Sequence, residues 1–468
     1  MRVAPIPMRT PGVLTQRTGM RHLLFAFALS MSGLGSAAAA ESLTLGAAVT
    51  QAVQANPRLQ ATGLERDARA LEQDIARGQR YPAVGIDATY THYSDPYLVH
   101  PIETPGVFPP LDTDVTSAGI SLRLPLYAGG RLVAGESLAA NTTASAVQRL
   151  RGSEQDLIFN VVSSYAKALQ LRDLAAAEVR RIEGLQAEVD AIQHKVDVGR
   201  AARLEVLRVQ SQLSGARFNQ AATTQGERDA LTLLAALMDT PVRTWLLQDL
   251  PVKPQSLPGS EETAAHQAVL ANPQVQQAQA ELDAAEDRVA IARGERRPRV
   301  DLVANSRTRR GGDWEGRDDW DVGLQLSVPV FDAGIRKSRV DQANLDRLQA
   351  QALLRGIVND VTTEARAAFG SLQTAKQQRE AARQALDESD EALRIETQSY
   401  HAGRSTVTDL LSAEAARWEA LASLNQAEYD EFVAAVRLQR ALGRLTPEVF
   451  ADGTPLSVEP LAVEEGTS

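Results

Sequence analysis

Two acidic residues follow the same kind of glycine turn in two distant parts of the 468-residue chain. Glu205 comes six residues after Gly199, and Asp409 comes six residues after Gly403. Carboxylates at matched positions attract cations and repel anions where several of them surround one opening. Alternatively, each acid lies in the first turn of a helix, where a negative charge interacts favourably with the helix dipole. The spacing alone leaves both interpretations open.

Residue types that carry catalysis or bind metals are sparse and poorly spaced. There is no cysteine, which excludes disulfides, thiol catalysis and thiolate metal sites. Neither a phosphate-binding loop nor a nucleophile elbow occurs. The formal net charge of −10 argues against a general nucleic-acid binder. We therefore expect no enzyme activity, no catalytic residue, no cofactor, no metal site and no nucleic-acid partner. The histidines after residue 40 lack metal-ligand spacing and are expected on the surface; they are His92, His100, His194, His266 and His401.

Residues 1–40 have the features of a secretory signal peptide. Basic residues precede a short apolar run, and small residues follow it up to Ala40. We expect cleavage after Ala40, with Met20 as an alternative to Met1 as the true start; a buried helix is the other interpretation. The later sequence contains no stretch apolar enough for a transmembrane helix, so any membrane span would have to consist of strands.

Most of the remaining chain is written twice in the same order. Four pairs of matching positions mark the two copies. The first two pairs are 216 residues apart and the last two are 204 apart, so the first copy carries 12 additional residues between them. An insertion of that kind belongs in an exposed loop. The pairs are Pro57 and Pro273, Pro82 and Pro298, Pro125 and Pro329, and Gly199 and Gly403.

This duplication predicts five segments of the chain. Residues 1–40 are the signal peptide, and residues 41–238 are the first repeat of helices, two strands and a long helical hairpin. Residues 239–263 are a proline-rich linker between the copies. Residues 264–446 are the second repeat, and residues 447–468 are an acidic tail that we expect to be loosely ordered.

Each repeat is predicted to begin with a capped helix. Asn56 and Asn272 directly precede a proline, and this pair of residue types suits the N-cap and the first helical position. We expect the helices that start there to run to Pro82 and Pro298, where proline ends them.

Each repeat is predicted to end with a long helical hairpin. A run of 69 residues without proline leads from Gly130 to Gly199, and an equal run ends at Gly403. At roughly 1.5 Å per residue, each long helix spans about 100 Å. The glycines supply the left-handed residue that ends a helix, so two shorter helices can return beside the long one. The first long helix has a coiled-coil spacing of apolar residues at Ile182, Leu185, Val189, Ile192 and Val196.

Between these helices, each repeat has two alternating segments that predict strands. Even-numbered positions in 118–126 and 320–330 are apolar, and the positions between them are small or polar. Each segment has about the ten residues that a tilted transmembrane strand needs. We expect the basic run 307–312 to be a solvated hairpin tip, with proximity to anionic lipid as the alternative. The polar faces hold Asp87, Arg123, Asp301 and Gln325, and aromatic residues near the strand ends are Tyr90, Tyr93, Tyr127, Trp320 and Phe331.

Four such strands cannot stand alone in a bilayer, because their edges would leave backbone amides unpaired in hydrocarbon. Other copies of the chain must close them, giving eight strands from two copies or twelve from three. Barrels of more than eight strands can enclose water, which the polar faces with Asp87, Arg123, Asp301 and Gln325 would line. The alternative is a soluble β-sandwich attached to a coiled coil.

Over residues 43 to 447 the sequence resembles the outer-membrane efflux proteins, a family of the TolC type. The resemblance rests on both "ANP" openings, on both strand ends of the form P-x-[YF] followed by glycine, and on the paired glycine turns. It implies a mixed α/β membrane protein. In this fold four transmembrane β-strands per protomer form a trimeric 12-stranded β-barrel, which long coiled-coil-like helices continue as a periplasmic α-helical barrel.

The resemblance also implies a function and partners. The expected protein is a passive exit duct of the outer membrane, belonging to a tripartite efflux or type I secretion system. Its expected partners are two further copies of itself, a periplasmic adaptor, an inner-membrane transporter and outer-membrane lipid. A periplasmic coiled-coil adaptor or scaffold is the alternative, although such a protein would have one hairpin and no need of four amphipathic strands.

In a trimer, Glu205 and Asp409 would place six carboxylates around a narrow mouth. The resemblance implies that polar links hold this mouth closed, and it matches Tyr400, three residues before the turn glycine, to a tyrosine of the family. Two positions depart from the family pattern, because Ser412 replaces a second acid and Ser405 replaces an arginine. The turn residues expected to contact the adaptor are Gly199, Arg200, Gly403 and Arg404.

Overall fold

The computed structural model describes residues 41–102, 104–243, 245–250 and 257–450. Contacts divide the chain into Met1–Glu41 and Ser42–Ser468, and the second unit holds the helices and the four-stranded sheet. The predicted signal peptide and most of the predicted acidic tail lie outside the described residues. None of the described helices combines the length and the apolar character needed to cross a bilayer.

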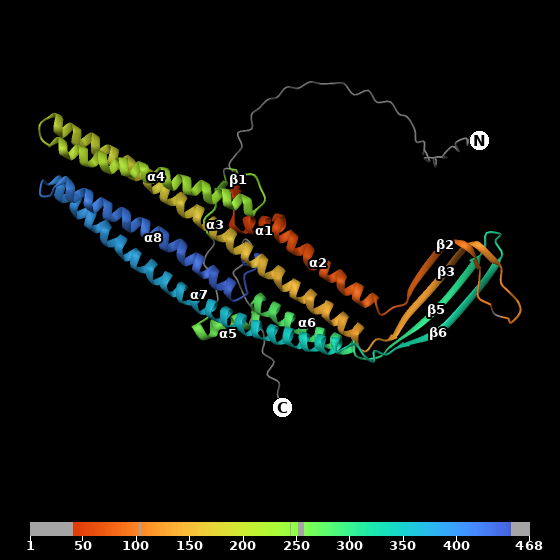
Figure 1. Ribbon diagram of the computed structural model, residues 1–468. Helices are drawn as coiled ribbons and strands as arrows, with labels where there is room; N and C mark the ends of the chain where they lie inside the picture. The colour runs from red at the N-terminus through yellow and green to blue at the C-terminus, as the bar shows by residue number, and fades with distance from the viewer. Residues whose placement is uncertain (1–40, 103, 244, 251–256, 451–468) are drawn as a thin grey trace, which may run out of the picture. The chain divides into compact units, whose positions relative to one another are not determined.

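The two copies fold into matching sets of elements (Figure 1). The long helices α3 and α7 have 67 residues each, and the returning helices α4 and α8 have 35 each. The predicted structural duplication is therefore confirmed. The first copy consists of α1 Leu45–Ala55, α2 Pro57–Gly78, β2 Ala83–Leu98, β3 Leu111–Tyr127, α3 Arg131–Asp197 and α4 Arg203–Leu237. The second consists of α5 Glu261–Ala271, α6 Pro273–Gly294, β5 Arg299–Arg310, β6 Gly316–Ser327, α7 Ile335–His401 and α8 Val407–Ala441.

The asparagine caps form as predicted and have a second role. Asn56 Oδ1 accepts hydrogen bonds from the backbone N–H groups of Arg58 (3.0 Å) and Leu59 (3.2 Å), which begins α2. Its amide group donates to the carbonyl oxygen of Leu237 at the end of α4, at 2.9 Å. Asn272 repeats this arrangement with Gln274 and Ala441. One side chain thus starts a short helix and fixes the end of the returning one. Helices α2 and α6 end at Gly78 and Gly294, four residues before the prolines at which we expected them to stop.

The long helix α3 packs against α4 along its C-terminal part, which leads to the hairpin turn, and against α1 and α2 along the rest of its length. The expected stacking of shorter helices beside a long one is therefore confirmed. Tyr165 lies fully buried on α3 at the centre of the main core. Its hydroxyl donates towards the carbonyl oxygens of Leu43 (2.8 Å) and Gln248 (2.6 Å). Leu43 ends β1 (Glu41–Leu43) and Gln248 follows β4 (Trp245–Leu247), and these two strands form a small sheet. The segment predicted as a proline-rich linker between the copies therefore contributes a strand, β4, whose end is hydrogen-bonded to α3.

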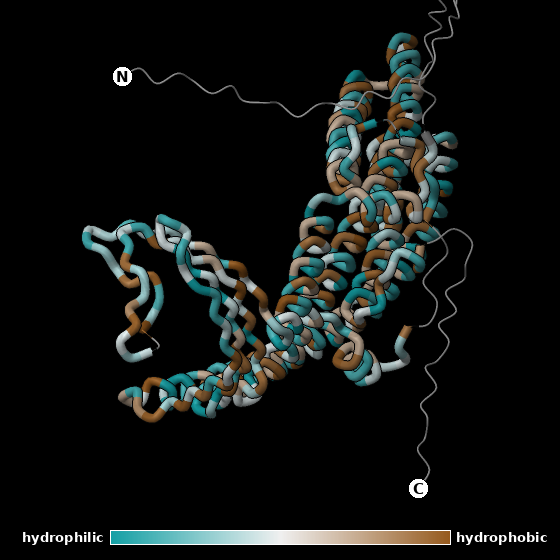
Figure 2. The backbone as a smooth tube through the Cα atoms, turned by 90° about the vertical axis from the view of Figure 1, so that its right-hand side faces the viewer, coloured by the Kyte–Doolittle hydropathy of each residue, from teal (hydrophilic) through white to brown (hydrophobic). Residues whose placement is uncertain are grey.

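The four long strands form one antiparallel sheet in the order β2-β3-β5-β6. Between two bulges, which follow His92 on β2 and Pro125 on β3, the register pairs even-numbered residues with even-numbered ones, so the apolar positions of all four strands share one face there. One apolar row reads Val84, Leu122, Ala304 and Val322, and the neighbouring polar row reads Gly85, Ser121, Asn305 and Asp321. Brown and pale colours alternate along these strands in Figure 2.

The structure corrects three of the sequence predictions at the element ends. Strand β6 ends at Ser327, so Val328 and Val330 follow the strand and do not belong to its apolar face. The basic run was expected at a hairpin tip, but Arg307 to Arg310 lie within β5, and the turn to β6 begins at Gly311. The described start of the predicted loose tail is a 3₁₀ turn (Pro447–Phe450), which buries the Phe450 ring in the main core.

The additional residues of the first copy lengthen its strands as well as its loop, since β2 and β3 have 16 and 17 residues whereas β5 and β6 have 12 each. The loop from β2 to β3 spans residues 99–110, whereas the loop from β5 to β6 spans only residues 311–315. The base of the long loop is closed by a hydrogen bond from Val99 N to Pro110 O at 2.9 Å. Asp112 Oδ2, at the start of β3, accepts from Gly312 N at 2.7 Å and ties the loop between β5 and β6 to that strand.

Candidate gate and channel surfaces

Both hairpin turns have the same backbone geometry. Gly199 has a φ of 72° and Gly403 a φ of 71°, so the predicted left-handed turn glycines are confirmed. The N–H of Gly199 donates to Val196 O at 2.9 Å, and the N–H of Arg200 donates to Lys195 O at 2.7 Å. Gly403 and Arg404 make the equivalent bonds in the second hairpin. This is the Schellman arrangement, which satisfies the last carbonyl groups of a helix.

Tyr400 lies beside a lysine of the other hairpin. Lys195 Nζ donates to the Tyr400 hydroxyl at 3.2 Å and stands 4.7 Å from the centre of its ring. Tyr400 is half-buried against the apolar cluster at the tip of the first hairpin. A polar link at Tyr400 therefore exists within one protomer, and its partner is a residue that sequence reasoning missed. Because the two residues come from different hairpins, no local pattern identifies the pair.

Asp409 is held by a helix cap. Its Oδ2 accepts from the backbone N–H of Thr406 at 3.0 Å and from the hydroxyl of Thr406 at 2.6 Å, while its own N–H donates back to Thr406 Oγ1. These hydrogen bonds favour the carboxylate and lower the pKa of Asp409. The side chain remains exposed to solvent. The Thr-x-x-Asp spacing is a recognisable capping signal that the sequence analysis did not use.

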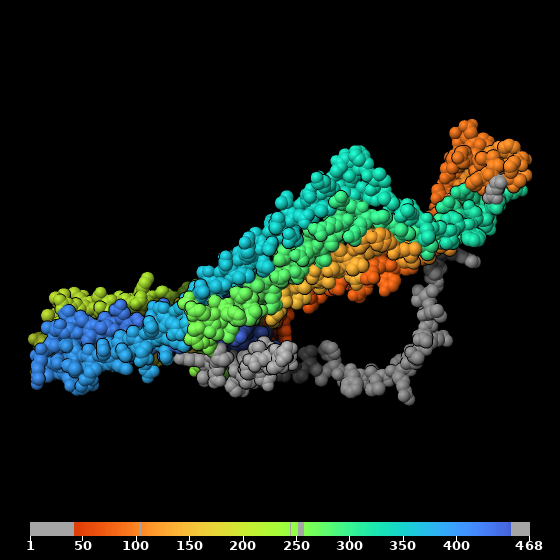
Figure 3. All heavy atoms as spheres, turned by 90° about the horizontal axis from the view of Figure 1, so that it is seen from below, coloured from red at the N-terminus to blue at the C-terminus, as the bar shows by residue number. Residues whose placement is uncertain are grey.

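Glu205 has no such cap, although it lies in the first turn of α4. Ala202 precedes α4 at the position that Thr406 occupies before α8, and it offers no side-chain hydrogen bond. Within the described ranges the carboxylate of Glu205 makes no hydrogen bond or ion pair. One turn further along, Arg208 donates a hydrogen bond to Thr408, which joins α4 to α8. The tips of the two hairpins therefore lie together, as Figure 3 also shows.

The polar face of the sheet carries the residues expected to meet water. Arg123 and Asp87 are exposed there. Asp301, predicted to line the water, is instead only 4% exposed, because Arg299 covers it with an ion pair of 2.7 Å between Nε and Oδ2. Among the residues that the structure describes, no group of three or more histidine, cysteine, aspartate or glutamate side chains is placed to hold a metal ion.

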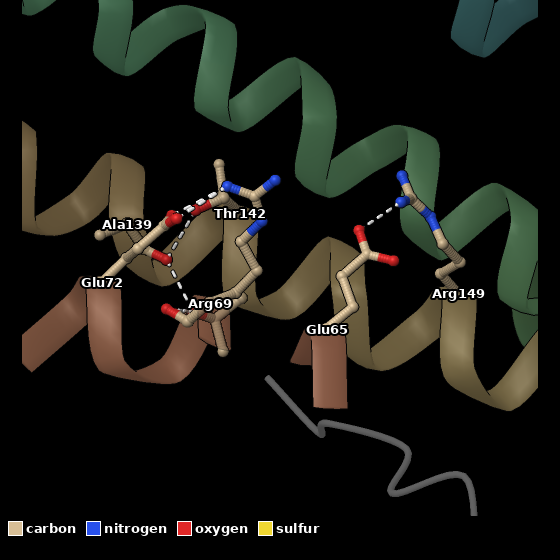
Figure 4. A network of polar contacts seen from close by, with 7 residues as sticks. Glu65, Arg69, Glu72, Ala139, Thr142 and Arg149 are labelled. Carbon is tan, nitrogen blue, oxygen red and sulfur yellow. Dashed lines mark hydrogen bonds and ion pairs between the residues drawn. The ribbon is translucent and has the colours of Figure 1, made fainter. Parts of the chain in front are cut away.

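Polar contacts also tie the helices of the wall together. Glu65 of α2 faces Arg149 of α3 in Figure 4, with 2.8 Å between Oε1 and Nη1. Thr143 on α3 donates to the carbonyl oxygen of Arg69 on α2 at 2.9 Å. On the other side of α3, Asn141 donates to Asp287 of α6 at 2.8 Å. A polar groove of about 520 Å³ crosses α2, α3, α6 and α7 at this level. Side chains that can contact water thus line the helices as well as the strands.

Comparison with known proteins agrees with this arrangement. The sequence profile of a family described as outer membrane efflux protein matches residues 48–239 and 264–444, which are the two repeats. The chain belongs to the outer membrane efflux protein family. It is therefore a protein of the outer membrane that acts in efflux.

Individual relatives share this length and fold. The outer membrane protein TolC of Escherichia coli is 24% identical over 437 residues, covering 90% of this chain and 86% of TolC. The alkaline protease secretion protein AprF of Pseudomonas aeruginosa is 26% identical, covering 64% of this chain and 63% of its own length. Among solved structures, the CmeC outer membrane channel of Campylobacter jejuni superimposes with a TM-score of 0.75 at 16% identity, over 85% of each chain. The fold is thus that of the TolC-like channels.

Proposed function

We propose that three copies of this chain form a passive exit duct across the outer membrane. The sheets of the three copies close edge to edge into a 12-stranded barrel, and the long helices continue it into the periplasm as a tunnel. The observation that carries this proposal is the register of the sheet. It gathers the apolar positions of four strands on one face and leaves β2 and β6 as open edges.

The exposure of the apolar face supports a lipid environment. Ile86 is 81% exposed, Trp320 79% and Leu324 68% in the single chain, each on the apolar face. A soluble sheet would bury such residues against a second layer. Strand edges with unpaired amides are not tolerated in hydrocarbon, so the edges β2 and β6 must pair with other copies.

The proposed partners follow from the family and from the exposed turns of the two hairpins. AprF is named for protease secretion, and CmeC for a channel. We propose that this chain works with an inner-membrane transporter and a periplasmic adaptor, in a tripartite efflux or type I secretion system. The adaptor contacts the turns at Gly199, Arg200, Gly403 and Arg404, which are the exposed ends of the hairpins.

The same proposal assigns a gate to the hairpin tips. In a trimer, Glu205 and Asp409 form a ring of six carboxylates that favours cations. The Asp409 carboxylate is ionised at neutral pH, since its hydrogen bonds with Thr406 lower its pKa. Tyr400 helps to keep the mouth closed through its contacts with Lys195.

Planar bilayers test this gate. Combined Glu205→Ala and Asp409→Ala changes should weaken cation selectivity, and Tyr400→Phe should raise conductance by removing the hydroxyl that accepts from Lys195. Glu183→Ala is a matched control on the exposed surface of α3, away from the tips. If the double variant keeps the same cation preference and the same block by divalent ions, the two carboxylates do not line the pore.

Membrane fractionation tests the proposed function as a whole. The protein should be recovered from detergent-extracted outer membrane as a stable trimer. Leu122→Arg, on the apolar face, should impair assembly by about 2–4 kcal/mol near the bilayer midplane. Ser121→Arg is the matched control on the polar face and should be tolerated. Equal trimer yields from the two variants would contradict the assigned faces, and a soluble periplasmic monomer would favour an adaptor or scaffold.

A further inference from the structure

The two strand-to-helix junctions carry different charges, and one difference is a carboxylate that only the second junction has. At the second junction, the carboxylate of Asp332 accepts from Gly334 N (3.2 Å) and Arg336 N (3.0 Å), and it pairs with the Arg336 guanidinium at 3.1 Å. The first amide groups of α7 therefore face an anion that the chain itself supplies. The equivalent residue at the first junction, 204 positions earlier, is Ala128, so no carboxylate occupies that place.

A groove of about 580 Å³ lies at the first junction. The end of α2, the base of β3, the start of α3 and the end of α6 surround it, and its lining includes the three arginines Arg123, Arg131 and Arg299. Glu295 is the only acidic residue among the described residues of that lining, and Arg339 already pairs with it at 2.9 Å. The groove thus has more positive than negative groups.

Two of its three arginines have no carboxylate partner among the residues that the structure describes. Arg299 is neutralised by Asp301, but Arg131 donates only to the carbonyl oxygen of Ala128, at 3.2 Å. The Arg123 guanidinium makes no hydrogen bond or ion pair with any described residue. Across the sheet, its row continues with Ala83, Val303 and Gly323, which carry no charge.

We propose that this groove binds an anionic group, a phosphate or a carboxylate, of cargo that passes through the duct. The guanidiniums of Arg123 and Arg131 supply the charge-assisted hydrogen bonds, for which their planar donor geometry is suited. The bound anion takes the place that Asp332 fills in the second copy. The assignment to cargo rests on the proposed function, because Arg123 belongs to the polar face that would line the lumen. A trimer then holds three such sites at one level, at the base of the strands.

Calorimetric titration with inorganic tripolyphosphate tests the proposal. The full mature chain is reconstituted in nanodiscs of neutral phosphatidylcholine, and light scattering gives its copy number in the same sample. We expect binding to the unchanged protein. Arg123→Gln and Arg131→Gln should each weaken it about tenfold, since each removes hydrogen bonds from a charged donor. Arg296→Gln is the matched control, an exposed arginine of the same junction outside the groove lining, and should leave the affinity unchanged.

A gain-of-charge variant gives a second arm. Ala128→Asp places in the first copy the carboxylate that the second copy has, so it should abolish tripolyphosphate binding while the protein remains trimeric. Unchanged affinity in both arginine variants, or an equal loss in Arg296→Gln, would overturn the proposal. A trimer that binds no tripolyphosphate would overturn it while leaving the exit duct intact, whereas a monomer would overturn the duct itself.

The source of the anion is distinguished by the lipid. In nanodiscs that contain phosphatidylglycerol, the affinity for tripolyphosphate should stay the same, because a lumenal groove is out of reach of lipid headgroups. Loss of binding in these nanodiscs, together with phosphatidylglycerol that co-purifies with the unchanged protein but not with Arg123→Gln, would assign the groove to lipid and overturn its assignment to cargo.

Discussion

The tip halves of the two helical hairpins have the same length and the same turns but different interiors. The first hairpin, α3 with α4, has an apolar seam whose central residues are buried: Leu185 is 4% exposed and Ile192 is fully buried. The second hairpin, α7 with α8, is half-exposed at the equivalent positions. The seam of the first hairpin is Ile182, Leu185, Val189, Ile192 and Val196, and its equivalents 204 residues later are Leu386, Ser389, Leu393, Glu396 and Tyr400.

The second hairpin is stabilised by polar contacts instead. Arg417 forms an ion pair with Asp390 across α7 and α8, at the place where Leu213 fills the first hairpin. The cap of Thr406 and Asp409 begins α8, whereas Ala202 leaves α4 uncapped. Among the described residues of α7, none beyond Ala375 is buried. Two hairpins with the same backbone geometry therefore differ in stability on their own. The first has a buried apolar interior, whereas the second leaves its interior half-exposed, and contacts with other copies in the proposed trimer would cover it.

The largest effect on stability is expected when a residue of the first seam is replaced by its equivalent in the second hairpin. Ile192→Glu removes a fully buried side chain and places a charge among Leu185, Val189 and Val209. We expect a loss of about 3–5 kcal/mol in the free energy of unfolding. Urea unfolding of the detergent-solubilised protein measures it, and limited proteolysis should show cleavage in the tip of this hairpin. Ile192→Val is the control, with a cost of about 1 kcal/mol. An Ile192→Glu protein as stable as the unchanged protein would show that the apolar seam does not stabilise the first hairpin.

The reverse exchange should stabilise the second hairpin. Glu396 is half-buried, and its Oε1 has no hydrogen-bond partner within the described part of the chain. Glu396→Ile restores the residue of the first copy, and we expect a gain of about 1–2 kcal/mol from apolar burial and from removal of the unpaired oxygen. The urea midpoint should rise. A fall in the midpoint would mean that Glu396 meets a polar partner in the assembled protein, and that the second seam is polar for that reason.

The two hairpins should also differ in how their stability depends on pH, because Glu414 of the second hairpin replaces Gln210 of the first. Burial in the groove between the hairpins, and secondly the nearby Glu188, raise the pKa of Glu414. Its ionisation therefore opposes folding, fully above the raised pKa and not at all below the unfolded value of about 4.3. Glu414→Gln should raise the melting temperature at pH 8 and leave it nearly unchanged at pH 4. An equal effect at both pH values would mean that ionisation is not the cause.

The smallest effect concerns the caps. Thr406→Ala should cost about 1 kcal/mol, because it removes the side chain that satisfies the start of α8. It should also raise the pKa of Asp409, whose stabilising ionisation is lost as the pH falls through the lowered folded value. Nuclear magnetic resonance titration of the carboxyl group measures that change. Ala202→Thr is the complementary variant and should stabilise α4. Equal stability of the unchanged protein and the two variants would show that a threonine cap at either helix start does not affect the free energy of unfolding.

Much of this fold follows from local patterns. The asparagine caps, the left-handed turn glycines and the alternation of the strands depend on neighbouring residues, so the sequence predicts them. The even-to-even register of the central rows also follows, because a slip by one residue would move the apolar side chains of a strand to the other face. The bulges after His92 and Pro125 do not follow from alternation. The duplication supports these predictions, since each pattern occurs in both copies.

The rest depends on contacts between distant segments. Lys195 and Tyr400 meet only because the two hairpins lie side by side, and Phe450 is buried because the helices around Tyr165 leave space for it. The cover of Arg299 over Asp301 depends on side-chain conformation and not on alternation. At the candidate gate, spacing therefore locates the two acids and could have located the cap of Thr406 and Asp409, whereas the contact between Lys195 and Tyr400 was found only in the structure.

Single-channel recording in planar bilayers tests the exit duct most directly. Purified, folded protein added to a bilayer should give discrete conductance steps of uniform size, and Leu122→Arg protein, which should fail to assemble, should give none. Uniform steps from the unchanged protein and from Ser121→Arg protein are the result that the account predicts. A folded protein that inserts into the bilayer without conducting ions, with or without the gate substitutions, would contradict it.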